Sequence, residues 1–216
     1  MKAKQLIENL ILRYPVLGPC RESVERSYKI MEDSFSKGKK LLIAGNGGSC
    51  SDANHIVGEM MKGFCLPRPC SKVFEARLMS VDSIRGAELA QKLQRALPSI
   101  ALDNHSAMST AFMNDVENGG ALVYAQQLYG YGVDGDVFLG ISTSGNAQNV
   151  VNAAVVAKAL GMKVLGMTGC SGGSLLQISD VCICVPEQET YKVQELHLPV
   201  YHTLCLMLEN HFFGEA

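Results

Sequence analysis

The chain has 216 residues, enough to bury a hydrophobic core without disulfide bonds or a structural metal. Its 19 basic and 21 acidic side chains nearly balance, which argues against the basic surface of a nucleic-acid-binding protein. No stretch approaches the roughly 18 consecutive apolar residues of a membrane-spanning helix, so we expect neither nucleic acid nor membrane as a partner.

The first 37 residues are predicted to form two helices. Apolar residues recur on one helical face within residues 6–11, and the charges of Glu8 and Arg13 indicate an amphipathic helix rather than a signal peptide. A second helix is predicted for residues 20–37, after a break that contains two prolines. The following domain would be complete without this apolar face, so we expect residues 1–37 to serve oligomerisation.

Residues 38–216 are predicted to form one α/β domain. Five short apolar runs have the character of buried strands, at residues 39–44, 99–102, 137–142, 164–168 and 181–185. Segments of helical length separate most of them or follow the last, at residues 50–62, 117–130, 147–160 and 190–213. This alternation implies right-handed βαβ units in a doubly wound, mostly parallel five-stranded sheet with helices on both faces.

Residues 64–98 do not follow this alternation. The segment begins with prolines and polar residues, and a helix is predicted for residues 85–97 within it. We interpret the segment as a helical insertion on the domain rather than as a second domain.

The eight cysteines form no C-x-x-C pair, and several of them lie in apolar runs such as residues 181–185. Reduced thiols of this kind are typical of proteins in a reducing compartment. We therefore expect a cytoplasmic protein.

Two of the predicted strands end in loops rich in glycine, hydroxyl and amide side chains. These loops contain Asn46, Gly47, Gly48 and Ser49 after the first strand, and Ser142, Thr143 and Ser144 after the third. Glycine lets an anion approach the backbone, and hydroxyls and helix N-terminal N–H groups can then bind it. No Walker lysine accompanies the loops, which argues against a nucleotide. Either loop alone could be an ordinary strand-to-helix turn, but the pair predicts a site for a small anionic molecule at the sheet's switch point.

A second set of polar residues lies on two predicted helices. His55 and Glu59 are four residues apart, so they share one helix face. Gln194 and His202 are eight apart, about 80° around the axis of the last helix. The four donors would suit zinc, although a His–Glu pair at this spacing is more often a solvated surface pair. A kink at Pro199 would change where the second pair points.

Together these motifs resemble the phosphoheptose isomerases, the sedoheptulose 7-phosphate isomerase branch of the sugar isomerase (SIS) domain proteins. The resemblance is carried by GNGGS with Asp52, His55 and Glu59, by GISTSGN, and by the Gln194-to-His202 segment. It extends from about residue 20 to the end of the chain, except for residues 64–98. It implies a flavodoxin-like SIS fold.

The resemblance also implies the roles of individual residues. One zinc ion per subunit would be bound by His55, Glu59, Gln194 and His202, with Glu59 and His202 as the catalytic acid/base pair. The sugar phosphate would contact the residues of both loops together with Glu59, Gln194, Asn114 and Asp115. Members of the family are homotetramers whose sites draw on more than one subunit.

The reaction implied is the interconversion of a ketose phosphate and an aldose phosphate, here sedoheptulose 7-phosphate and D-glycero-D-manno-heptose 7-phosphate. A proton moves between adjacent carbons through an enediol, which requires an acid/base pair and a group that stabilises the oxyanion, here zinc. The alternative is a non-catalytic SIS module that binds a phosphosugar or a protein. The replication initiator-associating proteins have similar loops but lack the His/Glu/Gln/His set.

This chain departs from the family pattern in three places. Ala147 occupies a position where the family often has serine, Pro199 lies inside the predicted ligand helix, and residues 64–98 form a longer segment than expected. These departures bear on which sugar is bound more than on the type of reaction.

Overall fold

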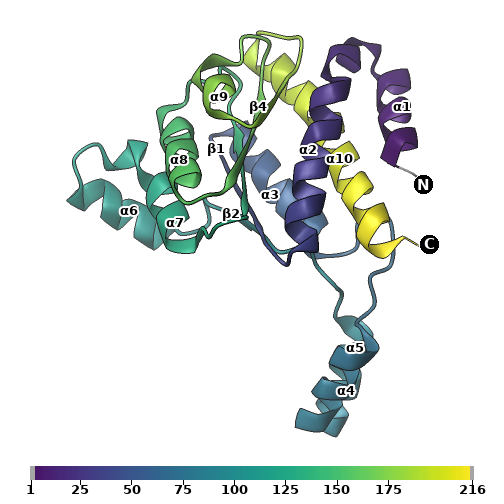
Figure 1. The fold of residues 1–216 in the computed structure, drawn as a ribbon. Coiled ribbons are helices and arrows are strands. Elements are labelled where there is room, and N and C mark those ends of the chain that lie inside the picture. The colour runs from purple at the N-terminus through teal and green to yellow at the C-terminus, as the bar shows by residue number, and fades with distance from the viewer. Residues whose placement is uncertain (1–2, 215–216) are drawn as a thin grey trace.

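Five parallel strands form the central sheet of the computed structural model, which describes residues 3–214 (Figure 1). The strands are β1 (Leu41–Gly45), β2 (Ser99–Ala101), β3 (Val137–Ile141), β4 (Lys163–Thr168) and β5 (Val181–Cys184). Their order across the sheet is β2-β1-β3-β4-β5, and all neighbouring pairs are parallel. This is the flavodoxin-like order, with its switch point between β1 and β3. The predicted doubly wound fold is confirmed.

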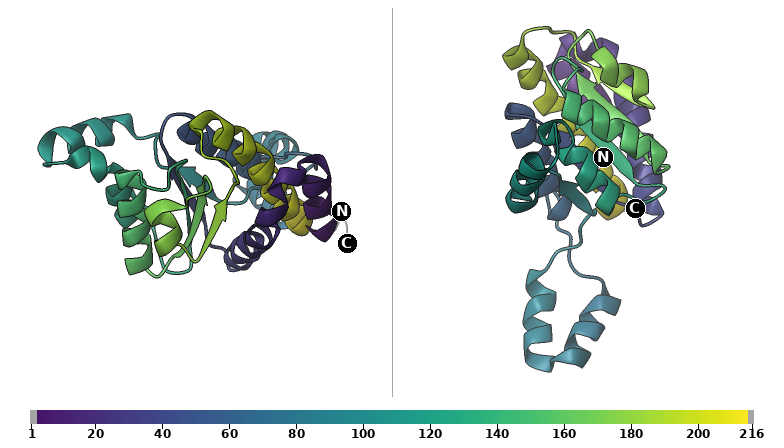
Figure 2. Two further views of the ribbon diagram at one scale, coloured as in Figure 1. Left: turned by 90° about the horizontal axis from the view of Figure 1, so that it is seen from above. Right: turned by 90° about the vertical axis from the view of Figure 1, so that its left-hand side faces the viewer.

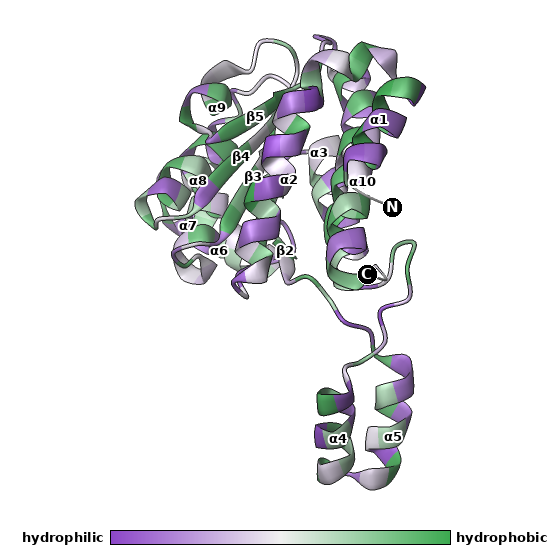
Figure 3. Ribbon diagram, turned by 45° about the vertical axis from the view of Figure 1, so that its right-hand side comes forward, coloured by the Kyte–Doolittle hydropathy of each residue, from purple (hydrophilic) through white to green (hydrophobic). Residues whose placement is uncertain are grey.

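Helices cover both sides of the sheet, so its strands are continuous apolar runs, and β1 and β3 are buried at every residue. Figure 3 shows the sheet strands as largely hydrophobic between the two helical layers. One layer contains α1 (Ala3–Arg13), the 3-10 turn η1 (Pro15–Cys20), α2 (Arg21–Ser36), α3 (Gly48–Met61) and α10 (Thr190–Phe213). The other contains α6 (Ser106–Asp115), the 3-10 turn η2 (Gly119–Ala121), α7 (Val123–Tyr131), α8 (Gln148–Ala159) and α9 (Gly173–Ile178).

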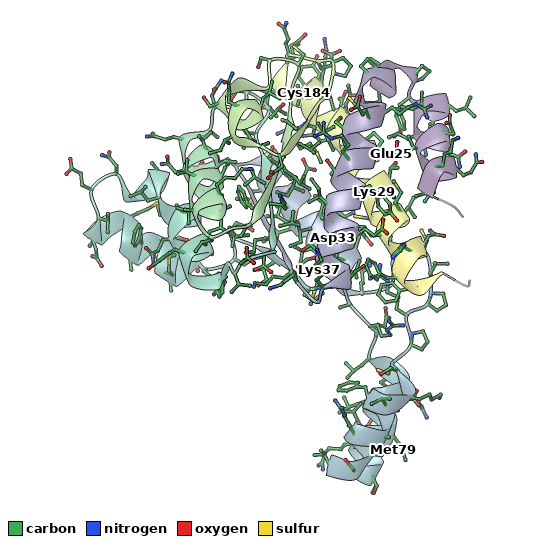
Figure 4. The ribbon with its side chains drawn as sticks, viewed as in Figure 1. Glu25, Lys29, Asp33, Lys37, Met79 and Cys184 are labelled. Carbon is green, nitrogen blue, oxygen red and sulfur yellow. The ribbon has the colours of Figure 1, made fainter. Side chains whose placement is uncertain are left out.

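The N-terminal helices share the core of the main body. Leu6 and Leu10 of α1 pack in one cluster with Leu204 and Leu208 of α10 and with the strand residues of that side. The opposite face of α2 is charged, and Figure 4 shows Glu25, Lys29, Asp33 and the C-cap Lys37 along its outer side. The apolar face of the N-terminal helices was expected to be left uncovered by the domain. That expectation is corrected, because α10 and the strands of the same chain cover it.

Residues 64–98 form a helical hairpin that projects from the body on two extended connections (Figures 1 and 2). The helix predicted at residues 85–97 corresponds to α5 (Ser83–Lys92), which begins and ends earlier, and a second helix, α4 (Lys72–Val81), lies beside it and was not predicted. Each begins at a capping side chain: Ser71 Oγ accepts the Phe74 N–H, and Asp82 Oδ1 accepts the N–H groups of Ile84 and Arg85. The hairpin exposes apolar side chains, among them Val73, Phe74, Met79, Val81, Ile84 and Leu89.

Two further helices were not expected. Helix α6 occupies residues for which no element was predicted, and α9 has only six residues. The helix predicted at residues 117–130 begins later, at Val123 after η2, because Asn118 adopts a left-handed conformation with φ of 57°. No helix within residues 3–214 is long and apolar enough to cross a membrane.

Candidate active site

The two glycine- and serine-rich loops lie together at the carboxyl ends of β1 and β3, at the switch point of the sheet. They enclose a cavity of about 390 Å³. It is lined by Asn46, Gly47, Gly48, Ser49, Ile141, Ser142, Thr143, Ser144, Ala147, Thr190 and Gln194. The structure therefore brings both predicted loops and Gln194 to one cavity.

Three helices begin at this cavity: α3 at Gly48, α8 just after Ala147, and α10 at Thr190. None of the three has a side-chain hydrogen bond at its N-cap. No charged residue is among the lining residues. The N–H groups and the positive ends of three helix dipoles therefore provide the attraction for an anion here.

Two glycines of the first loop shape the cavity in different ways. Gly47 has φ of 55° and ψ of −122°, a conformation that side chains disfavour. A Cβ atom at Gly48 would lie 2.5 Å from Gln194 Nε2, so a larger residue there would displace the Gln194 amide from its place in the cavity. With Gly47 and Gly48 at these positions, the first N–H groups of α3 and the first turn of α10 face the same cavity.

The hydroxyls of the second loop are held as donors. Ser142 Oγ accepts the N–H of Ala147 at 3.4 Å, and Ser144 Oγ accepts the N–H of Asn146 at 3.2 Å. A hydroxyl that accepts a backbone N–H keeps its own proton free to donate. Both serines can therefore donate to the oxygens of a bound phosphate.

Two residues that the sequence reasoning missed connect the loops. The amides of Asn46 and Asn149 exchange two hydrogen bonds, both 2.9 Å long, between the first loop and α8. Tyr124 on α7 donates its hydroxyl proton to the carbonyl of Gly45 at 2.7 Å. Nothing in the spacing of Asn149 or Tyr124 along the chain pointed to these contacts.

A His–Glu–His cluster lies further along α3 and α10, which run side by side (Figure 1). His55 Nε2 is 3.3 Å from Glu59 Oε1 and 3.4 Å from His202 Nε2. Atoms bound to a tetrahedral zinc at about 2.0–2.1 Å are about 3.3–3.4 Å apart, so both distances fit such a site. Within residues 3–214, however, no group of three or more His, Cys, Asp or Glu side chains is arranged as a complete metal site.

Gln194, the fourth predicted ligand, lies beside Gly48 at the loop cavity. It precedes His202 by two helical turns, about 12 Å along the helix axis. Helix α10 continues through Pro199 without interruption, so the register between the two residues is kept. The loop cavity and the His–Glu–His cluster are thus two ends of one region, both formed by α3 and α10.

The cluster favours a neutral imidazole at His202. Burial lowers the pKa of His202 below its ordinary value, and neighbouring His55 lowers it further, while Glu59 acts in the opposite direction. Glu59 is mostly buried and its other oxygen, Oε2, is 3.3 Å from Lys62 Nζ. The arrangement therefore combines a carboxylate with an imidazole that is free to accept a proton.

Asn114 and Asp115 lie apart from these groups. They end helix α6, where the Asn114 amide donates to Asp115 Oδ1 at 2.9 Å, and both are exposed. Neither is among the residues that line the loop cavity. Figure 1 places α6 at the outer edge of the molecule, beyond α7.

A buried ion pair holds the end of the helix that carries Glu59. Arg68 and Glu209 are both inaccessible to solvent and 2.9 Å apart. Arg68 also donates to the carbonyls of Glu59 and Met60, and Glu209 accepts three backbone N–H groups of residues 64–66. The pair thereby ties the last turn of α3 to α10 and to the base of the hairpin, and no spacing pattern in the chain predicts it.

Comparison with known proteins extends this description. Residues 82–169 match the SIS domain family. A phosphoheptose isomerase of Trichlorobacter lovleyi is 35% identical and is matched over 98% of this chain and 94% of its own length. One from Aneurinibacillus thermoaerophilus is 36% identical, over 83% of this chain and 76% of its own length.

The solved structures agree. Phosphoheptose isomerase from Neisseria gonorrhoeae superimposes with a TM-score of 0.70 and 28% identity, covering 96% of this chain and 91% of that chain. The enzyme from Francisella tularensis gives a TM-score of 0.71, also at 28% identity, over 88% and 86%. The chain therefore belongs to the phosphoheptose isomerases, a family of aldose–ketose phosphosugar isomerases built on the SIS domain.

Proposed function

We propose that the protein converts sedoheptulose 7-phosphate to D-glycero-D-manno-heptose 7-phosphate. The observation that carries this proposal is the spacing of the two parts of the site. Ser49 at the phosphate cavity and His55 in the cluster are six residues apart on α3, about 9 Å along the helix. A heptose with its phosphate on carbon 7 and its reacting groups on carbons 1 and 2 suits such a separation.

The chemistry is assigned to Glu59 and His202. Glu59 removes the proton from the carbon next to the carbonyl and returns it to the neighbouring carbon. His202, a neutral imidazole, takes the proton of the hydroxyl that becomes the carbonyl and delivers it to the former carbonyl oxygen, which becomes a hydroxyl. The low exposure of Glu59, 12% for its side chain, supports this role because little water competes for the carboxylate.

We further propose a zinc ion, one per subunit, held by His55, Glu59 and His202. Gln194, the fourth donor that the resemblance implies, lies in the loop cavity and would have to turn its side chain toward the cluster to bind the same ion. The two interatomic distances within the cluster support the first three ligands. Bound zinc would act as a Lewis acid on the substrate oxygens and stabilise the enediolate. Elemental analysis of protein purified without chelator measures the occupancy, and metal-free protein of full activity would contradict the assignment.

The residues of both loops are proposed to hold the phosphate, and the protein is proposed to be a cytoplasmic homotetramer. All eight cysteines are free thiols, which supports a reducing compartment. The exposed apolar side chains of the hairpin support association with further copies. Light scattering at micromolar concentration measures the oligomeric state, and a monomer would contradict it.

The direct test is product formation. Purified protein is incubated with sedoheptulose 7-phosphate in deuterium oxide, and the aldoheptose phosphate is followed by NMR with and without a chelator. We expect product labelled with deuterium at carbon 2, and loss of turnover after chelation. Protein that binds the substrate without forming product would instead favour the non-catalytic alternative.

A further inference from the structure

A buried tyrosine joins the two helices behind the His–Glu–His cluster. Tyr201 lies on α10, next to His202 in the chain, and only 1% of it is exposed. Its hydroxyl oxygen is 3.2 Å from Asp52 Oδ1 and 3.1 Å from His55 Nδ1. Asp52 and His55 are three residues apart on α3, so both face the tyrosine from the same side of that helix.

The direction of these hydrogen bonds follows from the number of protons available. The Tyr201 hydroxyl has one proton, and an ionised Asp52 can only accept. The second oxygen of Asp52, Oδ2, is buried without a hydrogen-bond partner among the described residues, so this carboxylate depends on the tyrosine for its hydrogen bond. The tyrosine therefore donates to Asp52, and its oxygen accepts from His55 when the imidazole proton is on Nδ1. With the proton on Nε2, the imidazole would instead donate to Glu59 Oε1, 3.3 Å away.

We propose that Tyr201 and Asp52 are positioning residues that fix His55 as the tautomer with its proton on Nδ1. The other ring nitrogen, Nε2, then presents a lone pair toward Glu59 and His202. That is the form in which an imidazole binds a metal, and partners of the distal ring nitrogen typically determine ligand orientation and affinity. The expected increase in zinc affinity rests on the function proposed above. The assignment of the His55 tautomer does not depend on that function.

The ring of Tyr201 also contacts both histidines. Its centroid is 5.6 Å from that of His55 and 4.9 Å from that of His202, and both contacts are edge-on. Phenylalanine at residue 201 keeps this packing and removes only the hydroxyl. Tyr201→Phe is therefore a specific test of the hydrogen bonds, and Tyr28→Phe, which removes the hydroxyl of a buried tyrosine on another helix, is the matched control.

The first measurement uses metal-free protein labelled with ¹⁵N in its histidines. Long-range ¹H–¹⁵N correlation spectra distinguish protonated from unprotonated ring nitrogens, and His55→Gln identifies the His55 signals. We expect the Nδ1–H form in the wild type and in Tyr28→Phe, and a mixture of tautomers in Tyr201→Phe. A wild-type His55 with its proton on Nε2 would overturn the proposal, as would an unchanged spectrum in Tyr201→Phe.

The second measurement is zinc affinity by competition with a chromogenic chelator. Tyr201→Phe and Asp52→Asn should each weaken zinc binding about 10- to 100-fold, the usual effect of removing such a partner, while Tyr28→Phe should not. Equal affinity in all variants would refute the link to the metal. If Tyr201→Phe does not fold, judged by circular dichroism, the wild-type spectrum and Asp52→Asn still decide the question. Absence of isomerase activity would count against the proposed function alone, because neither measurement uses the substrate.

Discussion

Glu59 is the residue whose role is tested most directly. Glu59→Gln keeps the size of the side chain and an oxygen donor but removes the proton acceptor. We expect turnover to fall by at least about 100-fold, the typical contribution of a positioned general base. Zinc occupancy should fall less than turnover.

Solvent deuterium exchange at the substrate carbon provides the measurement for this variant. His202→Asn should also be inactive, but there the loss of a ligand and the loss of an acid/base group coincide. A Glu59→Gln protein that retains zinc and exchanges the carbon-bound proton at the wild-type rate would show that another residue is the base. Glu59 would then be a ligand only.

The hydroxyl of Ser142 should act on substrate binding alone. The phosphate does not change during the reaction, so its contacts stabilise the ground state and the transition state equally. Ser142→Ala should raise KM several-fold, to about 10-fold, with kcat nearly unchanged.

Ala147 provides the opposite substitution at the same cavity. It is the N-cap residue of α8 and has no side-chain cap, so Ala147→Ser adds a hydroxyl at a position where serine is favoured. This variant should lower KM. Steady-state kinetics of both variants distinguish the roles, and a loss confined to kcat in Ser142→Ala would place the loop at the reacting carbons instead.

The residues of the site differ in how far the sequence could reveal them. Helical spacing placed His55 and Glu59 on one face, and the loops were recognised from their own composition. Contacts between distant segments, such as Asn46 with Asn149 or Tyr201 with Asp52, leave no periodic signal in a single sequence. Gln194 was grouped with His202 by spacing, but the structure shows it at the loop cavity, at the other end of the site.

At the scale of elements, the Arg68–Glu209 pair should dominate the stability of the region around the hairpin base. Arg68→Met leaves Glu209 charged, buried and without its ionic partner, although three backbone N–H groups remain. We expect the free energy of unfolding to fall by about 3–5 kcal/mol. Urea unfolding followed by circular dichroism provides the measurement.

The hairpin offers a matched control for this variant. Lys72 forms an ion pair with Glu75 that is 2.9 Å long but exposed, so Lys72→Met should cost less than about 1 kcal/mol. Similar losses of unfolding free energy in the two variants would mean that the buried Arg68–Glu209 pair stabilises the protein no more than an exposed ion pair does.

Elements were predictable where burial controls the residue pattern. The five strands are covered on both sides, so each is a continuous apolar run whose ends were placed within two residues. The hairpin lacks such a pattern because neither of its helices faces the core. Its division into two helices depends on the N-cap residues Ser71 and Asp82. Both are residue types that favour helix N-termini, so the sequence contains this signal, although the prediction for residues 85–97 did not include it.

For the molecule as a whole, His197 should make stability depend on pH. It is fully buried on α10, with Nε2 3.3 Å from the carbonyl of Thr168 on β4, and burial lowers its pKa from 6.5 to about 4. Between these values the unfolded chain binds a proton that the folded chain does not. The contribution of His197 is therefore full above pH 6.5 and decreases as the pH falls toward 4.

This dependence predicts a loss of about 2 kcal/mol from His197 between pH 7 and pH 5. In His197→Gln, whose amide can still donate to Thr168, the difference in unfolding free energy between these pH values should shrink by about that amount. Urea titrations at both pH values measure it. An identical pH dependence in the two proteins would show that folding does not lower the pKa of His197.

The packing of α1 against α10 also determines when the protein can fold as it is made. Leu6 and Leu10 belong to the same core cluster as Leu204 and Leu208, so nearly 200 residues separate partners in one layer. During synthesis, α1 and α2 leave the ribosome long before the helix that covers them. Until α10 has emerged, their apolar faces remain available to chaperones, and ribosome-bound chains that end before residue 190 should be sensitive to proteases along their entire N-terminal part.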